Sequence, residues 1–106
     1  YITLGAGIAG DGTGRAIGNA QYVNGIFMNG AKLNASSAGV GGNIVLNGQG
    51  APGTTFADGI YVTNSSVITD GAGTITFDGI GGAGTSDNNG IRIGSSAIMS
   101  VVNGAI

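Results

Sequence analysis

The chain contains no cysteine, histidine, tryptophan or glutamate, and it has a single proline. Without cysteine there can be no disulfide framework, although secretion is not excluded. Only 8% of the 106 residues are charged, and the formal net charge is −2. This balance favours neither nucleic acid nor an anionic membrane as a partner. No run approaches the roughly 18 apolar residues of a membrane-spanning helix, so no membrane insertion is expected. The sequence starts at Tyr1 without a methionine or a signal peptide, and we expect a fragment or a processed piece.

Glycine, by contrast, accounts for 24 of the 106 residues, about three times its usual share. The single proline and the lack of a three-residue period exclude collagen. A hydrophobic content of 42% is too high for a disordered glycine linker. A compact globule with so few charges would be poorly soluble, whereas a rod covered with threonine, serine and asparagine fits this composition.

The pattern G-x-G-x-x-G occurs three times, each time after a short apolar run, at 5–10, 48–53 and 79–84. One copy after a strand would suggest dinucleotide binding, with the pyrophosphate at the N-terminus of a following helix. Residues 11–19 hold three glycines, each costing a helix about 1 kcal/mol relative to alanine. The acidic residue expected about 20 positions later for the ribose is missing. The pattern therefore indicates a repeated corner, with the first copy at Gly5 marking the end of a strand.

A longer unit begins with Asn or Asp followed by Gly-Ile, at Asn24, Asp58 and Asn89, with spacings of 34 and 31 residues. A period of this size is typical of solenoids, in which each repeat buries its apolar side only against its neighbours. Alternation within the first strand of each unit predicts six inward residues, which are Ile26, Met28, Ile60, Val62, Ile91 and Ile93. The same alternation points Phe27, Tyr61 and Arg92 outward.

Each unit contains two further apolar runs. Eight residues past each glycine, Leu33, Val67 and Ile98 form a second inward column, which leaves Ile68 and Met99 outward. In the third run, the inward residues are Ile44, Leu46, Ile75 and Phe77. Glycine and Asx corners, where positive φ is tolerated, separate these runs. The sequence thus predicts an all-β fold in which residues 1–106 are one parallel β-solenoid segment. It would have three coils of three short strands and be open at both ends, with Asn24, Asp58 and Asn89 in a corner ladder.

The third unit lacks its last strand, and residues 1–4 match 43–46 and 74–77 in pattern. We therefore expect residues 1–10 to complete the third coil of a neighbouring copy or of a preceding repeat. The predicted partner is the chain itself, and a heterologous contact that does not close produces a filament. The residues assigned to this head-to-tail junction are Tyr1, Ile2, Thr3, Leu4, Ile98, Val102 and Ile106.

Residues 59–70, residues 73–79 and the glycine corner through Gly84 resemble the filamentous-haemagglutinin-like family, the β-helical repeats of large bacterial secreted exoproteins and adhesins. The resemblance covers essentially the whole chain. It implies a right-handed parallel β-helix in a long extracellular or surface-attached fibre, which mediates adhesion or builds matrix.

Neither catalysis nor a cofactor is expected. Of the five acids, Asp58, Asp70 and Asp78 each precede glycine, where corner geometry explains them. Asp58 and Asp78 also align with asparagines, so these positions are interpreted as requiring the shape of an Asx residue and not its charge. The loop 81–87 approaches a calcium-binding glycine-aspartate repeat, but its aspartate comes one residue late. We predict no catalytic residue, no metal ligand and no cofactor. An ice-binding Thr-x-Thr rank, Thr74-Ile75-Thr76, is not repeated.

The outward column of Phe27, Tyr61 and Arg92, together with Ile68 and Met99, is the predicted contact surface. Stacked rings and a guanidinium can hold a sugar or another filament, but stacking between neighbouring strands can also simply stiffen the sheet. An insertion at Asp11–Val23 adds a loop in which specificity could reside. The alternative function is therefore a carbohydrate-binding or carbohydrate-processing β-helix whose active residues lie outside this segment, with surface glycans as partners.

Overall fold

The computed structural model describes residues 1–6, 14–84 and 86–106, which form short strands and no helix. No helix in these ranges is therefore long and apolar enough to cross a membrane. The strands are β1 (Ile2–Leu4), β2 (Ala16–Ile17), β3 (Ile26–Asn29), β4 (Lys32–Asn34), β5 (Ile44–Gln49), β6 (Ile60–Thr63), β7 (Ser66–Ile68), β8 (Ile75–Ile80), β9 (Ile91–Ile93) and β10 (Ile98–Ser100). The all-β prediction is confirmed.

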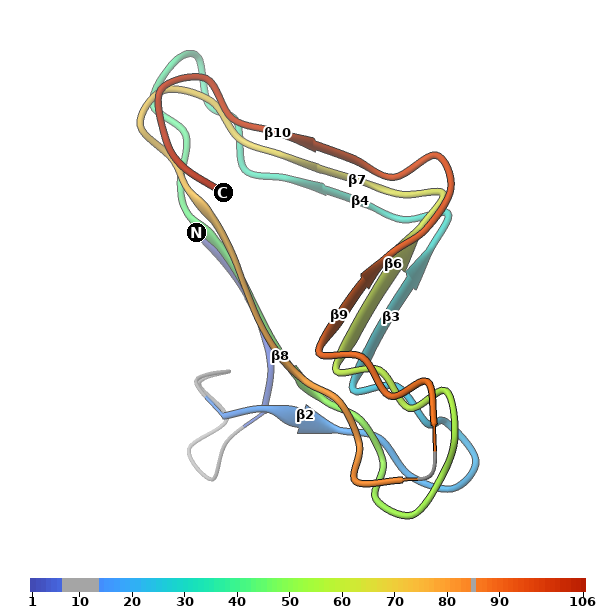
Figure 1. The fold of residues 1–106 in the computed structure, drawn as a ribbon. Coiled ribbons are helices and arrows are strands. Elements are labelled where there is room, and N and C mark those ends of the chain that lie inside the picture. The colour runs from blue at the N-terminus through green and yellow to red at the C-terminus, as the bar shows by residue number, and fades with distance from the viewer. Residues whose placement is uncertain (7–13, 85) are drawn as a thin grey trace.

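The strands form three parallel sheets, and the chain visits the sheets in turn (Figure 1). One sheet has the order β3-β6-β9, the second β4-β7-β10, and in the third β5 lies between β8 on one edge and β1 and β2 on the other. We call each visit to the sheets a pass. The first pass is β3-β4-β5, the second is β6-β7-β8, and the third is β9-β10. Residues one pass apart lie side by side, as the sequence period predicted.

The apolar core lies where the three sheets face one another. Seven buried residues form it, drawn from all three sheets: Met28, Ile44, Leu46, Ile60, Val62, Val67 and Ile75. Burying one such side chain contributes about 1.5–3 kcal/mol. The strands β5, β6 and β7 are buried best because each has a neighbouring strand on both sides, whereas Ile91 and Ile93 of the third pass stay 42% and 49% exposed. The inward orientation predicted for the first and third runs is confirmed.

The path of the chain after the N-terminal strand differs from the prediction. β1 pairs with residues 44–46 of β5, and β2 pairs with Gly48 and Gln49, so both lie along one edge of β5. Between these two strands, Ala6 and Gly14 form an antiparallel bridge. The insertion therefore begins after Leu4 and not at Asp11. Residues 7–13, which include part of the first G-x-G-x-x-G copy and of the predicted insertion, lie outside the described residues.

The true counterpart of the glycine corners is consequently Ala16-Ile17-Gly18 and not the copy at Gly5. Gly18, Gly50 and Gly81 hold the same place, directly after β2, β5 and β8. A Cβ built on them would lie 2.2, 1.9 and 2.2 Å from the carbonyl oxygens of Val23, Ala57 and Asn88. We call these three the neck glycines. Glycine is required here because two backbones approach closely, and not because φ is positive as the corner pattern suggested.

The second inward column also differs by one residue in the third pass. Met99, not Ile98, pairs with Val67 and packs against the core, while Ile98 pairs with Ser66 and is exposed. The corner between β9 and β10 holds four residues, 94–97, where the corner before it has one fewer between Val62 and Ser66. Because successive side chains point to opposite faces of a sheet, one extra residue moves each residue that follows it to the opposite face. The outward orientation predicted for Met99 is therefore wrong.

Asp70, which follows β7, binds the loop that follows β4 in the preceding pass. Its Oδ1 accepts the backbone N–H of Ser37 at 3.1 Å and its Oδ2 accepts that of Gly39 at 2.8 Å. These two hydrogen bonds, with the Gly39 bond the larger cause, hold the pKa of the Asp70 carboxyl below its usual value of 3.8. Both bonds favour the ionised form, so protonation weakens them.

This pKa shift predicts a loss of stability in acid. A carboxyl with a lowered pKa in the folded state adds stability above its unfolded pKa and loses it as pH falls through the folded value. We expect Asp70→Asn to be less stable than the parent chain at pH 6, and the gap to close as the pH falls below about 4. Urea unfolding followed by circular dichroism between pH 6 and pH 2 measures it. A gap that is independent of pH would contradict the role of the charge.

Candidate functional site

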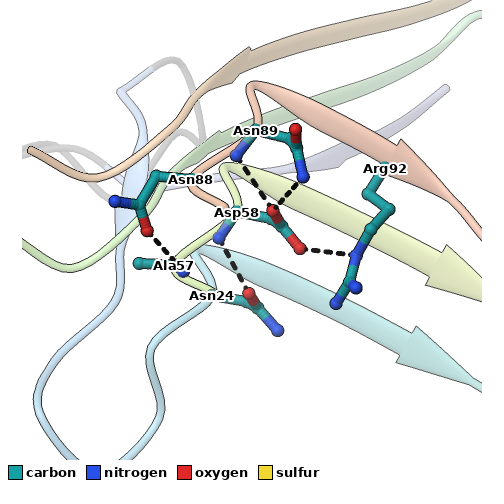
Figure 2. Close-up of polar contacts among 6 residues, drawn as sticks. All are labelled: Asn24, Ala57, Asp58, Asn88, Asn89 and Arg92. Atoms are coloured by element: carbon teal, nitrogen blue, oxygen red, sulfur yellow. Dashed lines mark hydrogen bonds and ion pairs between the residues drawn. The ribbon is translucent and has the colours of Figure 1, made fainter. Parts of the chain in front are cut away.

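The three Asx residues that begin each unit form a ladder at one corner (Figure 2). The backbone N–H of Asp58 donates to Oδ1 of Asn24 at 3.0 Å, and the backbone N–H of Asn89 donates to Oδ1 of Asp58 at 3.0 Å. Each side-chain oxygen thus accepts from the residue one pass above. Nδ2 of Asn89 also donates to Oδ1 of Asp58 at 3.0 Å. The predicted ladder is confirmed.

Asp58 contributes its charge to this corner as well as its shape. Its side chain is fully buried, and its Oδ2 lies 2.8 Å from Nε of Arg92 on β9. Figure 2 shows Arg92 reaching down from the third pass to the carboxylate. A buried carboxylate needs a cation or several donors, because the protein interior solvates charge poorly. The interpretation of position 58 as a pure Asx shape is therefore wrong.

The outward column has the stacked arrangement that the alternation indicated. The rings of Phe27 and Tyr61 are stacked, with centroids 5.2 Å apart and planes inclined by 9°. Cζ of Arg92 lies 3.7 Å from the centroid of Tyr61, within cation–π range. Arg92 therefore connects the buried Asp58 of the ladder to the outward aromatic column. Alternation predicted the column, but nothing in the spacing indicated the ion pair.

One end of the fold exposes its core. An apolar hollow of about 370 Å³ opens there, lined by Ile75, Thr76, Phe77, Ile91, Ile93, Met99 and Ile106. No described strand covers the free edges of β8, β9 and β10. The inward side chains of this last pass lack the neighbour that buries their equivalents below. This end is an unpartnered surface of the kind that marks an interaction site.

The residues assigned to the head-to-tail junction lie at both ends of the stack. Ile2 and Leu4 face the core beneath β5, with Thr3 between them and Tyr1 exposed before them. The others, Ile98, Val102 and Ile106, are exposed after β9. The structure therefore does not bring the two groups together within one chain.

The last residues continue the third sheet. The backbone N–H of Ile75 donates to the carbonyl of Ala105 at 2.9 Å, as that of Ile44 donates to Thr74 at 2.7 Å. Ile106 thus lies where the next strand of this sheet would begin, in one column with Ile2, Ile44 and Ile75. The repeat pattern assigned this strand wholly to residues 1–10, whereas its first position belongs to Ile106.

Three of the acids, Asp58, Asp70 and Asp78, have local partners. Nη2 of Arg15 contacts both carboxylate oxygens of Asp78, at 2.7 and 2.8 Å, an ion pair that sequence reasoning missed. Alternation could not reveal it, because Arg15 belongs to the segment that leaves the sheet. Within the described ranges, no three acidic, histidine or cysteine side chains gather at one point. In the loop 81–87, Thr85 lies outside the described residues.

A second hollow, of about 250 Å³, lies beside Phe27, at the end of the outward column that is farthest from Arg92. It is lined by Gln21, Tyr22, Val23, Asn24 and Phe27. Tyr22 and Phe27 are 70% and 55% exposed. Two aromatic rings beside two amides offer both a flat apolar face and hydrogen-bonding groups. Of the sequence-predicted contact residues, Ile68 faces outward on β7, away from both hollows.

Comparison with known proteins identifies no relative: no family model, no curated protein and no solved structure matches the chain.

Proposed function

We propose that the chain is a segment of a right-handed parallel β-helix that stacks head to tail with further copies of itself. In this proposal the stack is a structural element of an extracellular bacterial fibre, adhesin or matrix filament. Parallel strands joined by crossovers are right-handed in nearly all known cases, which supports the hand. The resemblance to β-helical exoprotein repeats supports the location.

One geometric observation carries the proposal. The third sheet is shifted by one strand relative to the other two. It has β1 and β2 before β5, where the other sheets have no strand before β3 and β4, and it ends at β8, where the other sheets continue to β9 and β10. A copy translated by three strand spacings, about 14 Å, would set its β3 on β9, its β4 on β10 and its β1 on β8. A single translation therefore places a strand on each of the three free edges.

The same translation covers the exposed core. The inward residues Ile26 and Met28 of the upper copy would lie over Ile91 and Ile93, and its Leu4 would lie over Phe77. Tyr1 and Ile2 of the upper copy would fall on the positions of Ala105 and Ile106, so one of these pairs has to move aside. An edge of parallel strands with an apolar face beside it is a ready template for such pairing.

Electron microscopy of the purified chain tests the proposal. We expect long unbranched filaments with an axial repeat of about 14 Å. The variant Ile93→Lys places a charge in the junction and should raise the critical concentration for assembly at least 100-fold, about 2.7 kcal/mol. The matched control is Val40→Lys, which adds the same charge at a side chain 81% exposed in a loop and should assemble normally. Discrete monodisperse particles of the parent chain would overturn the proposal.

A carbohydrate-binding β-helix is the second candidate function. The hollow beside Phe27 favours it, because aromatic rings stack on sugars and amides bind hydroxyl groups. Under this alternative, the catalytic or principal binding residues lie outside the segment. Monodisperse particles that bind an insoluble polysaccharide in a pull-down assay would favour it over the fibre.

A further inference from the structure

The aromatic column has a different group at each end. Phe27, Tyr61 and Arg92 hold the same outward position on three neighbouring strands. Phe27 is stacked on Tyr61 and also lines the hollow of about 250 Å³. At the opposite end, the guanidinium of Arg92 covers the ring of Tyr61. One end of the column is therefore aromatic and the other cationic.

Arg92 is held in place before any partner arrives. Its Nε contacts the buried Asp58 carboxylate at 2.8 Å, and its Cζ lies 3.7 Å from the Tyr61 centroid. Oδ1 of Asp58 is in turn fixed by the backbone and side-chain N–H groups of Asn89. A long side chain anchored in this way loses little conformational entropy on binding. The side chain is still 38% exposed, so its free side can meet a partner.

We infer that Arg92 is the recognition residue of the head-to-tail junction and inserts between Tyr61 and Phe27 of the next copy. The inference rests on the proposed stacking. Phe27 of a copy placed on β9 would lie two strand spacings above Tyr61, about 9.6 Å. Subtracting the 3.7 Å between Arg92 and Tyr61 leaves about 6 Å to the new ring, at the limit of cation–π attraction.

The hollow beside Phe27 has the right character to receive this group. Its walls combine Tyr22 and Val23 with the amides of Gln21 and Asn24. Ring faces suit the flat surface of a guanidinium, and the amide oxygen of Gln21 suits its N–H groups. In a head-to-head contact two guanidinium groups would meet and neither would gain a ring, whereas a head-to-tail contact places Arg92 against Phe27. The column therefore selects head-to-tail stacking over head-to-head stacking.

A double-mutant cycle across the junction tests the inference. Phe27→Leu removes the ring at one end. Asp58→Asn combined with Arg92→Met removes the cation at the other end without leaving a buried carboxylate unpaired. The critical concentration for assembly is measured for the parent chain, for each variant and for their combination. Urea unfolding of the unassembled chains measures any coupling within one copy, which is subtracted.

Each change alone should raise the critical concentration about tenfold, and the combination should also raise it about tenfold, because both remove one contact. A hundredfold rise for the combination means that the two groups act independently and overturns the inference. Filaments of all four proteins with equal critical concentrations also overturn it, but leave the proposed fibre intact. If the parent chain forms no filament, both fall. Binding of an added soluble polysaccharide that depends on Phe27, without coupling between Phe27 and Arg92, would assign the hollow to a sugar and overturn the inference.

Discussion

Alanine at Gly50 is expected to destabilise the fold by about 4 kcal/mol or more, enough to unfold a marginally stable domain. The added Cβ would lie 1.9 Å from the carbonyl oxygen of Ala57 and 2.6 Å from the backbone nitrogen of Gly82. Both contacts are with backbone atoms, so no side chain can rotate away. Relief requires opening the neck between the third strand of one pass and the first strand of the next. Circular dichroism and urea unfolding of the purified variant measure the loss.

Gly53→Ala is the matched control for this substitution. Gly53 has φ +74, and no other described atom lies within 4 Å of a Cβ built there. Alanine at this position should cost only the left-handed conformation, about 1–2 kcal/mol. The difference between the two variants isolates the effect of close backbone approach. If Gly50→Ala unfolds at the same urea concentration as Gly53→Ala, the neck is not required.

Asp58→Ala is the second substitution with a large expected effect, a loss of about 3 kcal/mol in the free energy of unfolding. The fully buried carboxylate accepts two hydrogen bonds from Asn89 and contacts Arg92. Its removal leaves the backbone N–H of Asn89 without its acceptor and Arg92 without its carboxylate. Urea unfolding at pH 7 measures the change.

Asp58→Asn distinguishes the acceptor from the charge. Asparagine occupies the equivalent positions 24 and 89, and its Oδ1 can accept the same backbone N–H. Because Arg92 is partly exposed and can turn toward water, we expect this variant to lose about 1 kcal/mol or less. An equal loss for the asparagine and alanine variants would show that the charge carries the effect.

Much of the fold could be predicted from the sequence, because strand alternation and a period of 34 and 31 residues are local properties. The two strand registers of the aromatic column and the order of the Asx ladder followed from them directly. The errors came from single insertions. An excursion separates β1 from β2 along one edge of β5, and one extra residue at 94–97 reverses the strand that contains Met99. A pattern read along the chain does not reveal whether an extra residue bulges out or shifts the register.

The candidate site was only half predictable for a related reason. Phe27, Tyr61 and Arg92 share an outward position by counting alone, so their stacking could be expected. The partnership of Arg92 with Asp58 depends on how far a long side chain bends over its neighbour, and counting says nothing about that. The pair of Arg15 and Asp78 likewise required knowledge of where an excursion returns to the sheet.

The sequence by itself determined that the chain forms parallel β-strands in repeated passes, since composition and periodicity leave no other way to bury its apolar residues. It also determined the ladder of Asn24, Asp58 and Asn89, because equivalent residues of such a repeat lie one above another. Only the tertiary structure decided why the neck glycines are glycine and which residues face the core after the extra one. Those answers depend on distances between backbones that are far apart in the chain, such as the approach of Gly50 to Ala57. Such distances result from packing whole passes together and are not encoded in any local pattern.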